Sequence, residues 1–177
     1  MPAVGVVHPS RRMQKILQVL NTLERNRVLC RYAIGGAMAA TFYAEPVLTF
    51  DLDIFIRLPD MTDPDLTLAP VYEALRRWVY AEEAECITIE GVPVQFLPAF
   101  NALIEEALSE ALGTRYEQTP TRVLRTEHLI ALAVQTGRDK DRQRARLLRE
   151  HAFIDTAYLP AILPRHNLET LWSQWIP

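Results

Sequence analysis

The clearest pattern of apolar and polar residues lies between Arg31 and Arg57. A short apolar segment at 32–34 precedes Gly35-Gly36, a helix-prone run at 37–43 and a segment at 50–56 in which apolar and polar residues alternate. Side chains of a strand point alternately to its two faces, so the alternation predicts a strand with one face against a core. The core face carries Phe50, Leu52, Ile54 and Ile56, and the opposite face carries Asp51, Asp53, Phe55 and Arg57.

The remaining pattern predicts helices with a few further strands. Apolar residues recur at helical spacing in 11–26, 67–78, 102–112 and 127–135, whereas 86–97 predicts a hairpin turning at Glu90-Gly91 and 121–124 a short edge strand. Gly113 is a typical helix end, and two short helices separated by Pro164 are expected near the C-terminus. Trp172 and Trp175 on the last of them predict docking onto the core or onto a partner in a homodimer.

Composition narrows the class of protein. With 49% hydrophobic and 23% charged residues, the chain has the composition of a globular protein, and its net charge of −3 provides no overall attraction to nucleic acid or acidic lipid. No apolar run approaches the roughly 20 residues that a membrane span requires. Cys30 and Cys86 lie in apolar contexts that predict reduced, buried thiols, so we expect a cytoplasmic protein.

The first candidate site combines Gly35-Gly36 with Asp51 and Asp53. Two carboxylates on one strand face lie about 6–7 Å apart and repel each other, and Mg²⁺, which takes one or two carboxylates together with phosphate oxygens, relieves that repulsion. Glycines let a phosphate approach the backbone closely. The alternatives are a solvated strand face, an ordinary turn, and an ion pair between Arg57 and Asp53 in place of a metal.

The second candidate site is the run Gly137-Arg138-Asp139-Lys140-Asp141. Gly137 predicts a break between two helices, and Asp139 or Asp141 can begin the second. Arg138 and Lys140 would then lie at a helix start, where free N–H groups and positive charge favour a triphosphate. The alternative is a charged helix face with partners one turn away.

Taken together, these residues resemble the nucleotidyltransferase superfamily of DNA polymerase β type. The resemblance rests on Gly35-Gly36 before a short helix, on Thr49-Phe-Asp51-Leu-Asp53 and on the Lys140-Asp141 pair, and it is closest to the small bacterial branch with AbiEii-like toxins. It implies that Asp51 and Asp53 are catalytic and bind Mg²⁺. It also implies that an NTP contacts Gly35, Gly36, Thr49, Arg138 and Lys140.

Two positions depart from the pattern of this superfamily. Gln95 stands where relatives commonly carry a third carboxylate that activates the attacking hydroxyl, and a neutral amide cannot act as a base. Val47 stands where relatives often carry an Arg.

The resemblance implies an α/β (α+β) fold: a short mixed sheet flanked by helices in an N-terminal domain, 1–98, and a helical region, 99–177, that closes the cleft. We expect Mg²⁺-dependent transfer of a nucleoside monophosphate to a hydroxyl of RNA, protein or a small molecule, in a protein that could be the toxin partner of an antitoxin. The alternative is a catalytically silent nucleotide-binding or toxin–antitoxin partner protein on the same fold.

Overall fold

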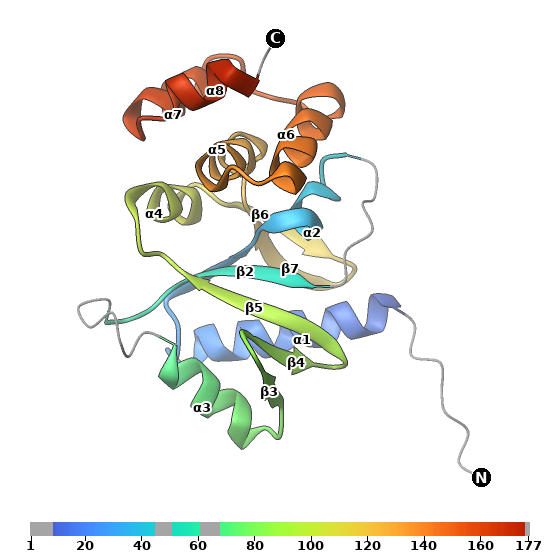
Figure 1. Cartoon of the computed structure of the whole chain (residues 1–177). Helices are drawn as coiled ribbons and strands as arrows, with labels where there is room; N and C mark the ends of the chain where they lie inside the picture. Colours follow the sequence, from blue (N-terminus) through green and yellow to red (C-terminus); the bar gives the residue numbers. More distant parts are fainter. Residues whose placement is uncertain (1–8, 45–50, 61–67, 176–177) are drawn as a thin grey trace.

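The computed structural model describes residues 9–44, 51–60 and 68–175, which form eight helices and seven strands (Figure 1). The helices are α1 Pro9–Arg25, α2 Gly36–Ala40, α3 Ala69–Arg77, α4 Ala102–Ser109, α5 Thr126–Thr136, α6 Asp139–His151, α7 Tyr158–Arg165 and α8 Glu169–Trp175. The strands are β1 Arg31–Ile34, β2 Leu52–Arg57, β3 Ala81–Glu83, β4 Cys86–Ile89, β5 Val92–Pro98, β6 Leu112–Tyr116 and β7 Thr119–Val123.

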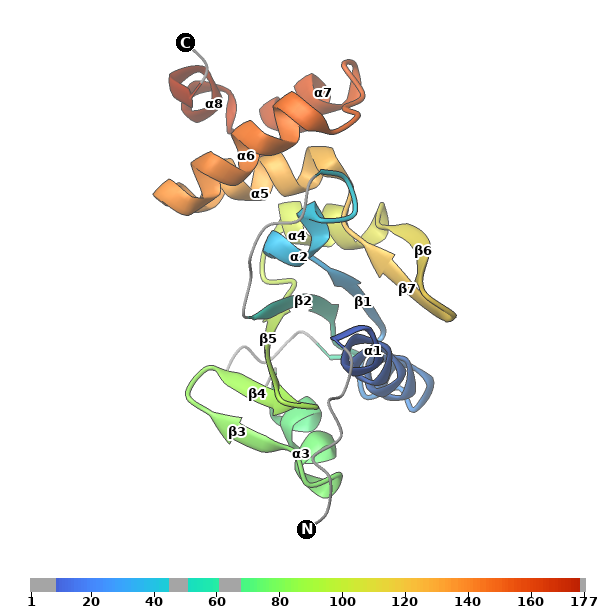
Figure 2. The ribbon, with the colours of Figure 1, turned by 90° about the vertical axis from the view of Figure 1, so that its right-hand side faces the viewer.

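The strands form one mixed sheet in the order β3-β4-β5-β2-β1-β7-β6. Strand β2 pairs with β5 in parallel and with β1 antiparallel, and β1 pairs in parallel with β7. Helices α1 and α3 lie on one side of the sheet and α2, α4 and α5 on the other, with α6, α7 and α8 beyond them (Figures 1 and 2). The predicted α/β class with a mixed sheet flanked by helices is therefore confirmed.

The apolar residues of β2 face the core, as the alternating pattern predicts. Leu52, Ile54 and Ile56 are almost fully buried, as is the apolar stripe of α1, which consists of Ile16, Leu17, Leu20 and Leu23. Tyr32, which lies opposite Ile56, hydrogen-bonds through its hydroxyl to Asn21 of α1 at 2.7 Å, so this face of the sheet meets α1. The opposite face of β2 is left to point toward α4, α5 and α6.

Two predicted elements are wrong. The helix expected to reach residue 112 ends at Ser109, and Leu112 starts β6, which pairs with β7 from Leu112↔Val123 to Tyr116↔Thr119, so Gly113 lies in a strand. Pairing with a neighbouring strand replaces a continued helical turn here. The region 99–177 is therefore not wholly helical, because it adds two strands to the sheet, and the division at residue 98 stays a prediction.

The structure differs from the sequence-based expectations in three smaller respects. Pro164 falls in the last turn of α7, where its missing N–H leaves one helical hydrogen bond unmade, and the break between the last helices comes after Arg165. Strand β3 was not predicted, since all its residues are exposed and show no alternation. Cys30 is exposed and Cys86 half-buried, so the expectation of buried thiols is wrong for Cys30.

A polar cluster joins three of the helices on the far side of the sheet. The Glu106 carboxylate of α4 accepts hydrogen bonds from the Arg165 guanidinium of α7, and it contacts His166 Nε2 at 2.7 Å and His128 Nε2 of α5 at 3.3 Å. Burial alone would raise the pKa of Glu106, but these hydrogen bonds outweigh it and lower the pKa to about 2. The cluster therefore holds α7 against α4 and α5 as a network that includes a buried histidine.

Within the described ranges, none of the helices combines the length and the apolar character that crossing a membrane would demand.

Candidate functional site

The Gly35-Gly36 turn lies directly against β2. The Gly35 N–H donates to the Asp53 carbonyl oxygen at 2.9 Å, and Gly36 has φ +57°. A Cβ on Gly35 would lie 2.2 Å from Phe55 Cε2, and one on Gly36 would lie 2.0 Å from Asp53 Oδ2. Both positions therefore need glycine for close approach, and Gly36 needs it also for its backbone conformation.

The parallel pairing of β2 with β5 sets Gln95 directly beside Asp53, and Leu97 beside Phe55. Asp51, exposed, and Asp53 and Gln95, both half-buried, line one cleft with Gly36. The predicted pairing of the two carboxylates with a Gly-Gly turn is therefore present in the structure, together with a neutral amide at the place expected for a third carboxylate.

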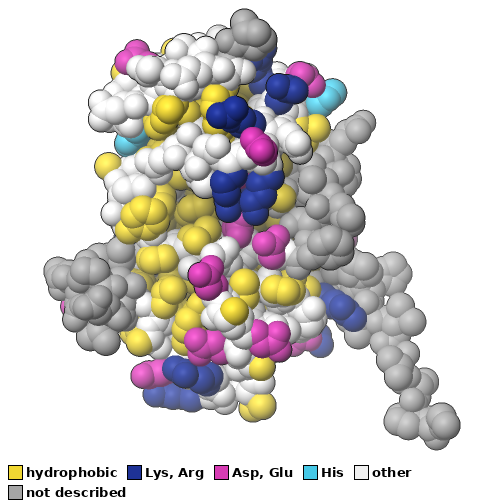
Figure 3. Space-filling view, in the orientation of Figure 1, with side chains coloured by type: hydrophobic (Ala, Val, Ile, Leu, Met, Phe, Trp, Pro, Cys, Tyr) yellow, Lys and Arg dark blue, Asp and Glu magenta, His cyan; other side chains and the backbone are white. Residues whose placement is uncertain are grey.

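The cleft has a volume of about 280 Å³ and lies between the sheet and helices α4, α5 and α6. Figure 3 shows this face, with a band of hydrophobic side chains beside a group of Lys and Arg above Asp or Glu side chains. The polar lining comprises Gly36, Asp51, Asp53, Gln95, Gln135, Thr136, Arg138, Lys140, Asp141 and Arg144, and the apolar lining Phe55, Leu97, Phe100, Ile104, Leu129, Leu132 and Ala133.

The first turns of α6 bring three cations to the cleft. Arg138 donates from Nε to Asp141 Oδ2 at 2.7 Å, and Arg144 donates to Asp141 Oδ1 at 3.4 Å. Asp141 is 1% exposed, so it anchors both guanidinium groups. The structure thus brings Arg138 and Lys140 to the site as expected, whereas Arg144 was missed. Its spacing of four residues from Lys140, which places both on one helix face, could have revealed it.

Burial and nearby charges both shift the pKa of the Asp53 carboxyl. Burial raises the pKa of its carboxyl above the ordinary value of 3.8, and the charge of Asp51 raises it further, while Arg144, Lys140 and Arg138 act in the opposite direction. A cation between the carboxylates would remove this repulsion. Carboxylates and an amide are the hard oxygen donors that suit Mg²⁺, so the donor set fits that metal.

No group of three or more His, Cys, Asp or Glu side chains suited to a metal occurs within 9–44, 51–60 and 68–175. Mg²⁺ does not require one, because it is commonly held by one or two carboxylates and completes its shell with water and substrate phosphates. The alternative of an Arg57–Asp53 ion pair is not what the structure contains. Arg57 donates instead to Glu105 at 2.8 Å and to Ser109 Oγ at 2.8 Å, both on α4.

Three of the positions discussed above lie outside the described residues. They are Thr49, a predicted substrate-binding residue, Val47, and Phe50, which the alternation assigned to the core face of the strand.

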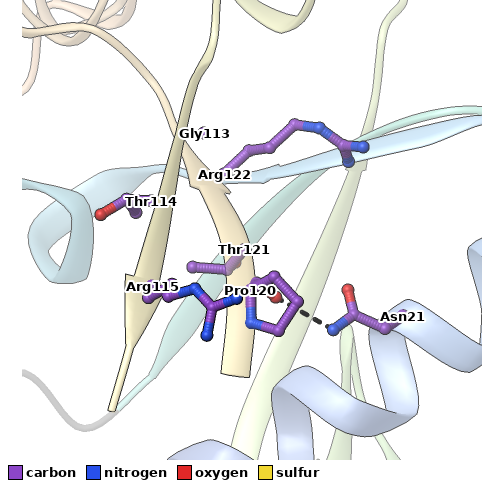
Figure 4. A pocket seen from close by; sticks show the side chains of 7 residues that line it. All are labelled: Asn21, Gly113, Thr114, Arg115, Pro120, Thr121 and Arg122. Atoms are coloured by element: carbon purple, nitrogen blue, oxygen red, sulfur yellow. Dashed lines mark hydrogen bonds between the residues drawn. The ribbon is translucent and has the colours of Figure 1, made fainter. Parts of the chain in front are cut away.

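A larger hollow of about 770 Å³ lies between α1 and the β6–β7 hairpin (Figure 4). Asn21 Nδ2 donates there to the Pro120 carbonyl oxygen at 3.0 Å, and Arg122 pairs with Glu24 at 2.9 Å. The described residues that line it include no carboxylate, so the smaller cleft is the better candidate for phosphate chemistry. The lining is Asn21, Gly113, Thr114, Arg115, Pro120, Thr121 and Arg122.

Solved structures with a similar fold include an antigenic nucleotidyltransferase-like protein from Paracoccidioides brasiliensis (TM-score 0.58, 11% identity, 93% of this chain and 87% of that one covered). The fold is nucleotidyltransferase-like. The antibiotic-resistance factor ANT(2'')-Ia is similar in its solution structure (TM-score 0.53, 14% identity, coverage 92% and 95%). It is also similar in its crystal structure in complex with adenylyl-2''-tobramycin (TM-score 0.50, 16% identity, coverage 92% and 96%).

No protein-family model matches the chain, and no curated protein matches its sequence. At these identities the similarity defines the fold, and the AbiEii-like branch stays a prediction.

Proposed function

We propose that this protein transfers a nucleoside monophosphate from an NTP to a hydroxyl acceptor. The observation that carries the proposal is the meeting of Asp51, Asp53 and Gly36 with the α6 cations in one cleft of a nucleotidyltransferase-like fold. A bound triphosphate needs positive charge that neutralises its own charge, and it needs a stretch of protein backbone that no side chain obstructs. This combination of residues can supply both.

Each part of the cleft has a defined role in this proposal. Asp51 and Asp53 would hold Mg²⁺, which when bound neutralises charge on the triphosphate. Of the two glycines, Gly36 lines the cleft and would present its backbone to the phosphates, whereas Gly35 is buried against Phe55. Lys140 forms no ion pair with any residue in the described part of the chain, so its charge is available to the triphosphate, whereas Arg138 is already oriented by Asp141.

The reaction forms a bond from the acceptor oxygen to the α-phosphorus and breaks the bond from that phosphorus to the bridging oxygen. Pyrophosphate leaves, and the acceptor proton passes to water, because the amide of Gln95 cannot hold it. Positioning and charge neutralisation supply most of the acceleration in such reactions, so an active enzyme without a third carboxylate is chemically reasonable.

The test is incubation of the full chain with each of four α-labelled NTPs, Mg²⁺, and cell RNA, lysate protein or hydroxyl-bearing small molecules. We expect label transfer and pyrophosphate release by wild type, with loss in Asp51→Asn and Asp53→Asn. The control Glu83→Gln removes an exposed carboxylate of β3 outside the cleft lining and should keep activity. Equal rates in wild type and Asp51→Asn with every acceptor would exclude transfer at this site.

The position of Gln95 beside Asp53 favours a second candidate, a protein that binds nucleotide without transferring it. Gln95→Glu separates the two. If the missing carboxylate limits catalysis, this variant should transfer faster than wild type by an order of magnitude or more, as expected for a general base. If wild type is already active, the change in rate should be small.

The nature of the acceptor is a further part of the proposal. The crystal complex of ANT(2'')-Ia with adenylyl-2''-tobramycin supports a small molecule with a hydroxyl group as the class to try first. A role as the toxin of a toxin–antitoxin pair, with an antitoxin partner, rests on the resemblance in sequence. Its test is growth arrest on expression of wild type but not of Asp53→Asn.

A further inference from the structure

One half of the cleft is made of apolar side chains that the phosphate chemistry does not use. Phe55, Ile104 and Leu129 are buried and form its floor, whereas Phe100 at its mouth is 74% exposed. An aromatic ring this exposed presents apolar surface to water that no described residue of the chain covers. A ligand that covers it would remove that surface from water.

The apolar half begins immediately beside the carboxylates. Phe55 and Leu97 follow Asp53 and Gln95 by two residues on the same faces of the paired strands, which places them about 6–7 Å further along the sheet. Figure 3 shows the hydrophobic band next to the Lys and Arg group on the same face. The cleft is thus divided into a charged half and an apolar half that one molecule could span.

A polar group with a defined orientation accompanies the apolar half. The Asn101 side-chain oxygen accepts from the Ile104 N–H at 2.9 Å, which leaves the Asn101 amide nitrogen to donate to Gln135 Oε1 at 3.1 Å. This arrangement fixes the Gln135 amide with its NH₂ as the remaining donor. Gln135 lines the cleft, so this donor can meet an acceptor on a bound ring.

We propose that the apolar half binds the nucleobase of the donor NTP, with Phe100 stacking on the base and Gln135 donating a hydrogen bond to its edge. The inference rests on the proposed function. An NTP joins a polyanionic chain to a flat aromatic ring through ribose, which matches the two halves of the cleft.

The experiment is calorimetric titration of the full chain with tripolyphosphate, with α,β-methylene NTPs that cannot be cleaved at the reacting bond, and with nucleosides, all in Mg²⁺. We expect an NTP to bind more tightly than tripolyphosphate. Phe100→Ala should weaken NTP binding by roughly 5- to 100-fold, the usual effect of losing one base–aromatic stack, and leave tripolyphosphate binding unchanged. Phe100→Tyr keeps a flat ring and should retain NTP affinity.

Phe153→Ala is the matched control, since Phe153 is 88% exposed and lies outside the cleft lining. Gln135→Ala should weaken NTP binding and spare tripolyphosphate. Unchanged NTP affinity in Phe100→Ala, or equal weakening of NTP and tripolyphosphate, would overturn the base assignment. Nucleoside binding that depends on Phe100, in a protein that neither binds tripolyphosphate nor transfers label, would support the base site while removing the proposed transferase function.

Discussion

Replacement of Gly36 by Ala tests whether the turn and the carboxylate site form one unit. Two costs apply at this position. An L-residue at φ +57° costs about 1–2 kcal/mol relative to glycine. The new Cβ would also lie 2.0 Å from Asp53 Oδ2 and 2.8 Å from its Cγ, distances at which an atom must move.

The movement cannot easily be taken up by the backbone. Residue 53 is paired on both sides, to Gly35 through its carbonyl oxygen and to Gln95 in the ladder with β5, so the Asp53 carboxylate must rotate away instead. Forcing an extra methyl group into a packed site costs about 1–3 kcal/mol. We therefore expect the free energy of unfolding to fall by about 2–5 kcal/mol, which corresponds to a melting temperature lower by about 4–20 °C.

Substitutions at two other glycines separate the conformational cost of positive φ from the cost of close approach to a neighbour. Gly91 also has positive φ, +77°, but a Cβ there would approach only Arg12 Nη1, at 3.7 Å. Gly91→Ala should therefore show the conformational cost of about 1 kcal/mol and no change in ligand binding. Gly113 lies in β6 with nothing within 4 Å of a new Cβ, so Gly113→Ala should be close to neutral.

The assay combines thermal unfolding of the three variants with titration of Mn²⁺ and tripolyphosphate. We expect Gly36→Ala alone to lose both stability and ligand affinity, because it displaces a carboxylate that the proposed site requires. A Gly36→Ala protein that melts and binds like Gly91→Ala would refute the argument that close approach to Asp53 is what this glycine provides.

The remaining predictions concern two carboxylates with opposite pKa shifts. Because the pKa of Asp53 is raised in the folded chain, ionisation of this carboxyl opposes folding without metal once pH rises above 3.8. Asp53→Asn should therefore unfold at a higher temperature than wild type at neutral pH and lose this advantage in acid, whereas the control Glu83→Gln, at an exposed carboxylate of β3, should not change the melting temperature. The pKa of Glu106 is instead lowered from 4.5 to about 2, so its contribution is present above pH 4.5 and lost as pH falls toward 2. Glu106→Gln should lower the free energy of unfolding by about 1–3 kcal/mol at neutral pH in urea denaturation, whereas the exposed Glu110→Gln should not; equal midpoints would show that the cluster contributes nothing.

Local features of the molecule were accessible from sequence alone. The alternation in β2, the stripe of α1 and the turn at Glu90-Gly91 follow from side-chain period and turn chemistry within a few residues. For the same reason Asp51 and Asp53 could be assigned together to one side of the strand. Gly35-Gly36 stood out because a pair of adjacent glycines is a local signal of unusual backbone.

Tertiary structure decided how these segments meet. Whether Gln95 lies beside Asp53 depends on the register between β2 and β5, which are separated in sequence by α3, β3 and β4, and sequence predicted its position only through resemblance. Strand β6 replaced a helical turn because β7 offered backbone partners that no local pattern reveals. Arg144 and Phe100 face the cleft only because α6 and the end of β5 pack around it. The periodic spacing of apolar residues depends only on residues close together in the chain. A site is instead formed by packing between residues distant in sequence, and that packing determined which residues line this cleft.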